Sequence, residues 1–119
     1  MTNMNASSGI YLKFLNLVRA LDRAPVFPAL DANEERLLNQ LAAVWEADKS
    51  ITVVETMNMA TEMSPTTVHR RLKTLRQKGI IDLTIDADDN RIKYVVPTAT
   101  TNAYFTQLSN CLLAAAKGR

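Results

Sequence analysis

Two local signals delimit one helix in the middle of the chain. Ser64 is a preferred N-cap residue, and Pro65 suits the first helical position because its missing amide hydrogen has no partner there anyway. Gly79 suits the left-handed conformation in which many helices end. These signals predict a helix over residues 65–78. Residues 64–78 contain five cations and no acid.

This one-sided charge occurs in a chain that is close to neutral. The 119 residues contain 14 Lys and Arg against 12 Asp and Glu, a formal net charge of +2. Five of the cations lie in 64–78, so nine remain against the 12 acids elsewhere, which leaves −3. A solvated cationic face is the common explanation for such a run. Ion pairs between residues four apart cannot account for it, because the segment holds no acid.

The predicted helix has one apolar stripe and one basic face. At about 100° per residue, Val68, Leu72 and Leu75 share a direction and should face the core. The opposite direction is shared by Thr66, Arg70, Lys73 and Gln77, with Thr67, His69 and Thr74 beside them. Arginine can form two hydrogen bonds with guanine, and threonine can contact a thymine methyl group or a phosphate. The pattern indicates a helix that binds nucleic acid.

The neighbouring segments complete a recognisable order of elements. Thr52 and Glu55 have the spacing of a capping box, which predicts a short helix over residues 53–59. Two alternating apolar runs around a polar turn predict a β-hairpin over residues 81–96. With a further helix after the N-cap residue Asp31, this order predicts a winged helix-turn-helix core over residues 30–98.

Apolar helices are predicted on both sides of this core. Residues 10–23 form one, and residues 99–117 form the other, helical from about Thr100. Both contain more apolar residues than one buried face needs, so we expect them to form a dimer interface. The predicted fold is therefore mainly α (α+β), a single winged helix-turn-helix domain with flanking N- and C-terminal helices.

The core segments resemble the MarR-like winged helix regulators. Residues 64–72 have the sequence SPTTVHRRL, followed by Leu75 and by GII at 79–81, and resemble the recognition helix of that family. The hairpin resembles its wing, whose pattern is D-x-R followed by V-x-L-T. The resemblance covers about residues 30–98. It implies that Arg91 enters the minor groove of DNA and that Asp89 orients it.

The wing also departs from the family pattern. Asp82 stands where cations are common, and Asp86, Asp88 and Asp89 crowd the turn. Acids repel phosphate, so we expect the wing to contribute less to DNA binding than the resemblance implies.

The predicted function is sequence-specific binding of double-stranded DNA by a homodimeric transcriptional regulator. A two-fold dimer would place two recognition helices about one helical turn of DNA apart. The predicted DNA-binding residues are Ser64, Thr66, Thr67, His69, Arg70, Arg71, Lys73, Thr74, Arg76, Gln77, Lys78, Arg91 and Lys93. The alternative is a protein-interaction winged helix that joins a larger assembly through its terminal helices without contacting DNA.

Rare residue types exclude several other functions. The chain has one His, one Cys and three Gly, which rules out an intrachain disulfide, a zinc site of His and Cys, and a glycine-rich phosphate loop. No acid lies beside His69 or Cys111 in an arrangement that suggests catalysis. We therefore expect no enzyme activity, metal or cofactor. The lone thiol, the absence of an export signal and the lack of a long apolar run indicate a cytoplasmic protein.

Overall fold

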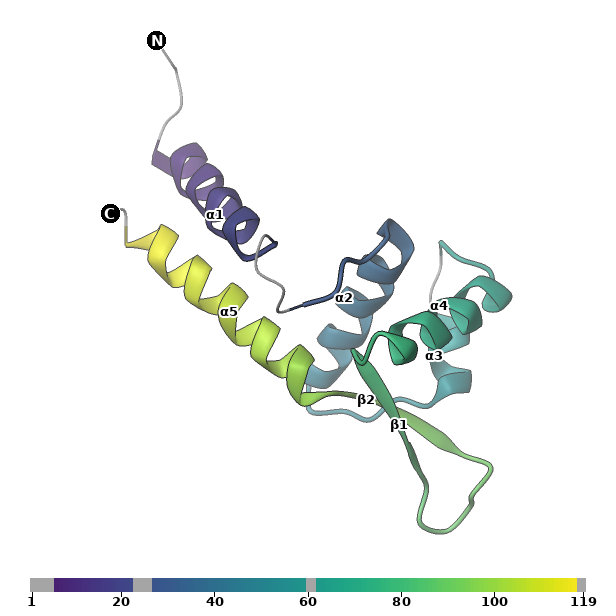
Figure 1. Ribbon diagram of the computed structural model, residues 1–119. Helices are drawn as coiled ribbons and strands as arrows, with labels where there is room; N and C mark the ends of the chain where they lie inside the picture. Colours follow the sequence, from purple (N-terminus) through teal and green to yellow (C-terminus); the bar gives the residue numbers. More distant parts are fainter. Residues whose placement is uncertain (1–5, 23–26, 60–61, 118–119) are drawn as a thin grey trace. The chain divides into compact units, whose positions relative to one another are not determined.

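The structure is mainly helical, with one antiparallel hairpin. A computed structural model describes residues 6–22, 27–59 and 62–117 (Figure 1). Over these ranges the order of elements is α1 (Ala6–Asp22), α2 (Ala32–Glu46), α3 (Val53–Met59), α4 (Pro65–Gln77), β1 (Ile81–Ile85), β2 (Lys93–Pro97) and α5 (Ala99–Ala116). The predicted fold class is confirmed. None of the described helices has both the length and the apolar composition needed to cross a bilayer.

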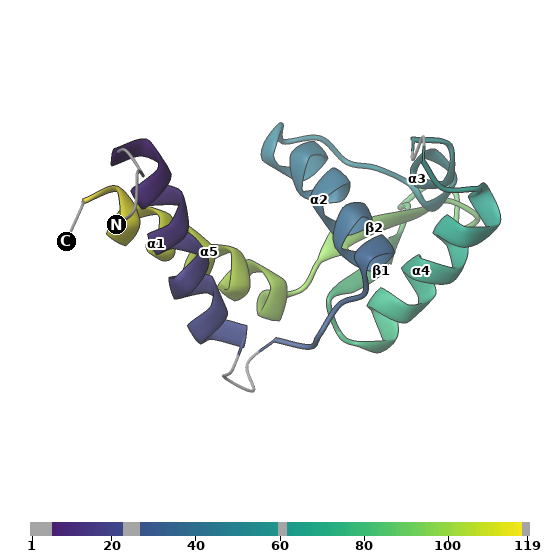
Figure 2. The ribbon, with the colours of Figure 1, turned by 90° about the horizontal axis from the view of Figure 1, so that it is seen from above.

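The chain divides into two compact units. Leu30–Ala99 contains α2, α3, α4 and the hairpin. Met1–Ala29 and Thr100–Arg119 form the other unit, which contains α1 and nearly all of α5. The elements of each unit can be followed in Figure 2.

Both α2 and α3 begin with the predicted cap residues. The Glu34 amide donates to Asp31 Oδ1 at 2.7 Å, and the Asp31 amide donates to Glu34 Oε1 at 2.9 Å. Thr52 and Glu55 form the same reciprocal pair at α3, with distances of 3.0 and 2.9 Å. These bonds satisfy amides that have no partner within the first helical turn. They define the start of two helices that both contact α4.

The ends of α4 follow the predicted signals closely. The Thr67 amide donates to Ser64 Oγ at 3.2 Å, so Ser64 is the N-cap residue. The helix ends at Gln77, with Lys78 as its C-cap residue, and Gly79 follows with φ of 75°. Its buried residues are Val68, Leu72 and Leu75, which confirms the predicted apolar stripe.

Hydrogen bonds at the edge of β2 opposite β1 connect the hairpin to α2 and to the segment before α3. β1 and β2 pair antiparallel in a register that runs from Ile81 opposite Pro97 to Ile85 opposite Lys93. At the other edge of β2, the Val95 amide donates to the Ile51 carbonyl at 2.8 Å. Trp45 Nε1 donates to the Val95 carbonyl at 3.1 Å. The apolar core of this unit consists of Leu37, Leu38, Leu41, Ile51, Val68, Leu72, Leu75, Ile80, Ile81 and Val95.

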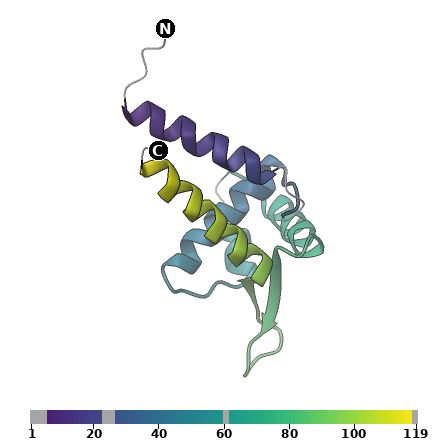
Figure 3. The ribbon, with the colours of Figure 1, turned by 60° about the vertical axis from the view of Figure 1, so that its left-hand side comes forward.

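In the other unit α1 and α5 lie side by side (Figures 1 and 3). α1 begins at Ala6, four residues earlier than predicted, and its predicted end at Arg23 lies outside the described residues. Phe27 stacks on Tyr104 with ring centroids 3.9 Å apart, and Cys111 is buried. Several large apolar side chains of this unit are nevertheless exposed: Ile10, Tyr11, Leu12, Leu112 and Leu113.

Replacing Gly79 with alanine should lower the free energy of unfolding by about 1 kcal/mol. The cost comes from the backbone alone, because φ is 75° and a Cβ at this position would meet no atom within 4 Å. Gly9→Ala is the matched control. Gly9 also has open space around it but lies within α1, so alanine there should stabilise by about 0.5–1 kcal/mol. Urea unfolding measures both variants, and a shift in the same direction for both would contradict this account.

Candidate nucleic-acid interface

The outer face of α4 presents polar and basic side chains to solvent. It lies opposite the buried stripe, as the helical period requires. The exposed members of the predicted set on this helix are Thr66, His69, Arg70, Lys73, Arg76 and Gln77. We call these six residues the outer face of α4.

The predicted residues at the start of α4 bond to each other. Ser64 Oγ donates to Thr67 Oγ1 at 3.0 Å while it accepts from the Thr67 amide. Ser64 is exposed, and Thr67 is half-buried. Their hydroxyl groups therefore stabilise the first turn of the helix, from which Thr66 extends into solvent.

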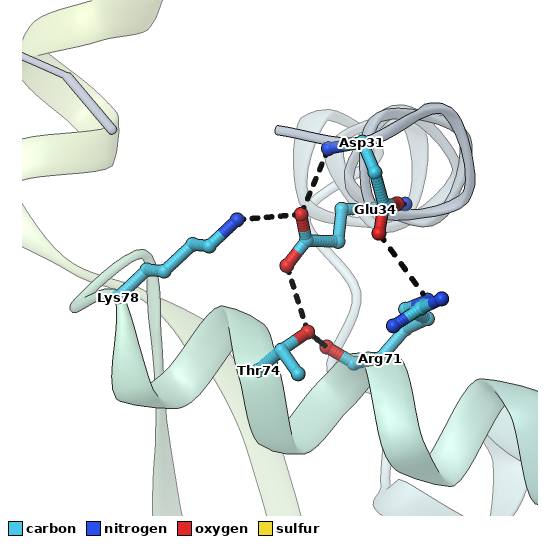
Figure 4. Close-up of polar contacts among 5 residues, drawn as sticks. All are labelled: Asp31, Glu34, Arg71, Thr74 and Lys78. Atoms are coloured by element: carbon cyan, nitrogen blue, oxygen red, sulfur yellow. Dashed lines mark hydrogen bonds and ion pairs between the residues drawn. The ribbon is translucent and has the colours of Figure 1, made fainter. Parts of the chain in front are cut away.

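Three predicted residues contact the start of α2. Lys78 Nζ donates to Glu34 Oε1 at 2.7 Å, and Thr74 Oγ1 donates to Glu34 Oε2 at 2.7 Å (Figure 4). Arg71 Nε lies 3.5 Å from Asp31 Oδ2. Figure 4 shows the Glu34 carboxylate between Lys78 and Thr74, with Arg71 beside Asp31. We call these five residues the α2–α4 clamp.

The Glu34 carboxylate is buried and stays ionised. Glu34 is 1% exposed, and burial by itself would raise the pKa of its carboxyl group. Hydrogen bonds from Lys78, the Asp31 amide and Thr74 outweigh burial, so the pKa of Glu34 lies below its ordinary value of 4.5. From the sequence alone, Glu34 is an acid in the first turn of a helix, where a negative charge is favourable. Its place on one stripe with Leu38 and Leu41, four and seven residues on, was the available signal for burial.

Arg71, Arg76 and Lys78 have acidic partners outside α4, which the sequence of the helix alone does not reveal. Besides Arg71 and Lys78, Arg76 Nε lies 3.6 Å from Asp82 Oδ1 on β1. Both side chains of this pair are more than half exposed, so solvent weakens the attraction and Arg76 can exchange partners. The basic face is therefore narrower than the run of five cations suggests.

On the wing, Arg91 and Asp89 form a two-point contact. Arg91 Nε and Nη2 each donate to a different Asp89 oxygen at 3.0 Å, and the Arg91 amide donates to Asp89 Oδ1. The Arg91 side-chain bond holds the pKa of Asp89 below its ordinary value and raises that of Arg91. The Arg91 side chain is 87% exposed. Asp89 therefore holds the Arg91 guanidinium at two points while the side chain stays exposed.

Asp86, another acid of the wing, stabilises the turn of the hairpin. Asp86 Oδ1 accepts from the Tyr94 hydroxyl at 2.8 Å, and Asp86 Oδ2 accepts from the amides of Asp88 and Asp89 at 3.0 and 3.1 Å. The Tyr94 bond is the main reason that the pKa of Asp86 lies below its ordinary value. Asp86 therefore has a structural role in the turn, and its negative charge remains in the wing.

A groove lies between α4 and the wing. It comprises two adjoining hollows of about 540 and 330 Å³ that share Val53, His69, Leu83 and Lys93. The apolar lining comes from Val53, Val54, Leu72, Leu83 and Ile92. The basic lining comes from Lys73, Arg76, Arg91 and Lys93, with Glu55 also present. Exposed cations from α4 and from the wing thus border one concave surface.

Comparison with known proteins identifies the fold. No protein-family model matches the chain, and no curated protein is similar to it in sequence. Several solved structures do match. The transcriptional regulator Tm0710 from Thermotoga maritima has a TM-score of 0.62 at 14% identity, over 92% of this chain and 68% of that one. The heme sensor protein PefR from Streptococcus agalactiae has a TM-score of 0.58 at 21% identity, over 96% of this chain and 76% of that one.

A mutant MarR from E. coli, solved in complex with operator DNA, also matches. Its TM-score is 0.53 at 18% identity, over 89% of this chain and 65% of that one. The chain has the MarR-like winged-helix fold. In this MarR-like fold, α3 and α4 form the helix-turn-helix, and the hairpin of β1 and β2 is the wing.

The stabilising effect of Glu34 should disappear in acid. Because its folded pKa is lowered, its contribution is complete above an unfolded pKa near 4.5 and is lost as the pH falls through the folded pKa. Glu34→Gln removes this contribution. The difference in free energy of unfolding between the native protein and this variant should therefore shrink between about pH 7 and about pH 3.

Urea titration across this pH range measures the difference. Glu35→Gln is the control, since Glu35 is exposed in the same helical turn and its substitution removes the same charge. A Glu34→Gln difference that stays constant with pH would show that the carboxylate charge adds no stability.

Proposed function

We propose that this protein is a sequence-specific, double-stranded-DNA-binding transcriptional regulator that acts as a homodimer. α4 lies in the major groove, and the hairpin over residues 81–96 contacts the adjacent minor groove as a wing. One observation supports this most strongly: His69, Lys73 and Arg76 of the outer face of α4 line the same groove as the exposed Arg91, within one compact unit. The operator complex of the similar MarR structure is a precedent for that fold on DNA.

Position relative to the groove separates two kinds of contact on this surface. Thr66, Arg70, Lys73 and Gln77 point away from the core, so they are the candidates for base edges and for positioning in the major groove. His69, Arg76 and Lys93 line the groove towards the wing and suit phosphate contacts. Ser64 and Thr67 can offer hydroxyl groups to phosphate at the start of the helix.

We give the clamp residues of α4 a different role from the one that the sequence predicted. Arg71, Thr74 and Lys78 bond to the start of α2, and direct contact with DNA would require them to leave acidic partners. They support the DNA-binding helix from its inner side. The proposed interface therefore comprises the outer face of α4, Ser64, Thr67, Arg91 and Lys93.

The dimer is proposed from the other unit. Leu112 and Leu113 on α5 are 55% and 61% exposed, and Tyr11 on α1 is 60% exposed. Ile10 and Leu12 on α1 are also exposed. Large exposed apolar side chains on both helices of this unit favour association with a second surface. A second copy of the chain would also supply the second recognition helix that an operator of two half-sites requires.

DNA binding should weaken steeply with salt. A dimer that neutralises about 6–10 phosphates should give a slope of log K against log salt of about −0.9 per contact. Fluorescence anisotropy with duplex DNA between low and high salt measures this slope. A flat dependence would contradict the proposal, and no binding at low salt would favour the alternative of a protein-interaction module.

Arg70→Ala should weaken binding to the preferred sequence by about 1–3 kcal/mol and relax specificity at one base position. The arginine is exposed on α4 and can form two hydrogen bonds with guanine. Lys49→Ala is the control, because Lys49 is an exposed cation of the same unit outside α4 and the wing. Equal loss on every sequence would make Arg70 a phosphate contact.

Replacing Leu113 with glutamate should dissociate the dimer. A charge at the centre of an apolar interface loses its hydration without gaining a partner. Sedimentation equilibrium should show a dimer for the native protein and a monomer for the variant, with unchanged helical content by circular dichroism. Val54→Glu is the control, since Val54 is exposed but belongs to the winged-helix unit. A dimer that survives Leu113→Glu would place the interface elsewhere.

A further inference from the structure

The capping role of Glu34 does not explain its surroundings. Glu55 forms the same capping box at α3 with a bond of the same length, and it does so while exposed. Glu34 is buried instead and accepts two further bonds, from Thr74 and from Lys78 on α4. Among the residues that the structure describes, it is the only acidic or basic residue that is buried. Its burial therefore serves the contact between α2 and α4.

The contacts of the clamp follow one stripe of α4. Arg71, Thr74 and Lys78 are spaced by three and four residues, so their side chains share one side of the helix. Each oxygen of the Glu34 carboxylate bonds a different member of this stripe, and Asp31 pairs with the third. Turning α4 by one residue, about 100°, would break all of these contacts at once.

Apolar packing alone sets the rotation of α4 less sharply. Contacts among leucine and valine side chains depend on buried area and tolerate small shifts and repacking. Hydrogen bonds of 2.7 Å to a buried carboxylate depend on distance and angle, and leaving such a carboxylate unpaired is costly. The clamp therefore favours one rotation of α4, in which Thr66, Arg70, Lys73 and Gln77 face outwards.

We propose that the α2–α4 clamp, with Glu34 at its centre, is a positioning device that sets the rotation of α4 and thereby the selection of DNA sequence. Glu34 touches no base in this scheme and acts through Thr74 and Lys78. The clamp also keeps the Lys78 ammonium group on Glu34, where it cannot add a sequence-independent phosphate contact. The inference rests on the proposed DNA-binding function.

Specific and nonspecific binding should respond differently to loss of the clamp. Base-edge contacts need correctly placed side chains, whereas phosphate attraction depends mainly on charge. Glu34→Gln keeps the shape of the side chain but removes the charge that holds Lys78 in place. Thr74→Val keeps the shape and removes the hydroxyl group that bonds Glu34 Oε2. Both variants should reduce affinity for the preferred duplex and leave or increase affinity for other duplexes.

The experiment compares Kd values for two duplexes by fluorescence anisotropy. One duplex is selected by the native protein from a random library, and the other has the same composition in scrambled order. Glu34→Gln and Thr74→Val should each lose about tenfold on the selected duplex, the cost of one misplaced base contact, and little on the scrambled one. In Glu34→Gln the salt slope on scrambled DNA should steepen by about 1.8, about 0.9 for the Lys78 that becomes available in each protomer of the dimer. Adding Lys78→Met should remove that increase.

Glu35→Gln is the matched control, since it removes an exposed carboxylate one residue away. It should change the Kd for neither duplex by more than about twofold. All measurements are made where circular dichroism shows each variant fully folded. A Glu34→Gln variant with a lowered unfolding midpoint but an unchanged ratio of specific to nonspecific affinity would overturn the proposal, because Glu34 would then only stabilise the fold.

A DNA-free measurement separates this inference from the proposed function. If the native protein binds neither duplex, the proposed function fails, and the clamp is judged from backbone amide chemical shifts of α4. Changes in these chemical shifts along the whole of α4 in Glu34→Gln and Thr74→Val, but not in Glu35→Gln, would support the proposal that the clamp sets the rotation of α4. Unchanged shifts beyond the immediate neighbours of the substituted residue would overturn it.

Discussion

The contact between the first turn of α2 and the inner side of α4 is the constraint on which the winged-helix unit depends. Apolar residues of both helices belong to one buried core, and the Glu34 carboxylate adds directional bonds at its edge. The same carboxylate caps α2. One side chain thus connects the start of one helix to the placement of another. The buried stripe of α4 determines which residues this helix exposes, and the proposed clamp sets the rotation at which they are presented.

Charge in this protein is organised by pairing between elements. The five cations of residues 64–78 differ in their partners: Arg71 and Lys78 pair with Asp31 and Glu34, Arg76 pairs with Asp82 on β1, and Arg70 and Lys73 extend into solvent. On the wing, Asp89 orients Arg91, and Asp86 accepts bonds from the turn and from Tyr94. A nearly neutral chain can therefore present a basic surface, because several of its acids are engaged in ion pairs and hydrogen bonds within the fold.

Local signals were sufficient to predict most of the secondary structure. The caps at Asp31, Thr52 and Ser64, and the left-handed Gly79, depend on residues within a few positions of one another, and all of them occur in the structure. The hairpin follows from alternation around a polar turn. The start of α1 was predicted four residues too late, because the apolar period begins at Ile10 while the helix extends into the polar residues before it.

The sequence by itself determined the helices, the hairpin and the apolar stripe of α4, because these depend on short-range periodicity and capping. It also determined that five cations lie on one helix. Only the tertiary structure decided which of these cations pair with acids of other elements. Asp31 and Glu34 precede Arg71 and Lys78 by 40 and 44 residues, so no local rule connects them. Their pairing exists because α2 and α4 pack together, and burial makes a nearby cation the best partner for a carboxylate that has left water.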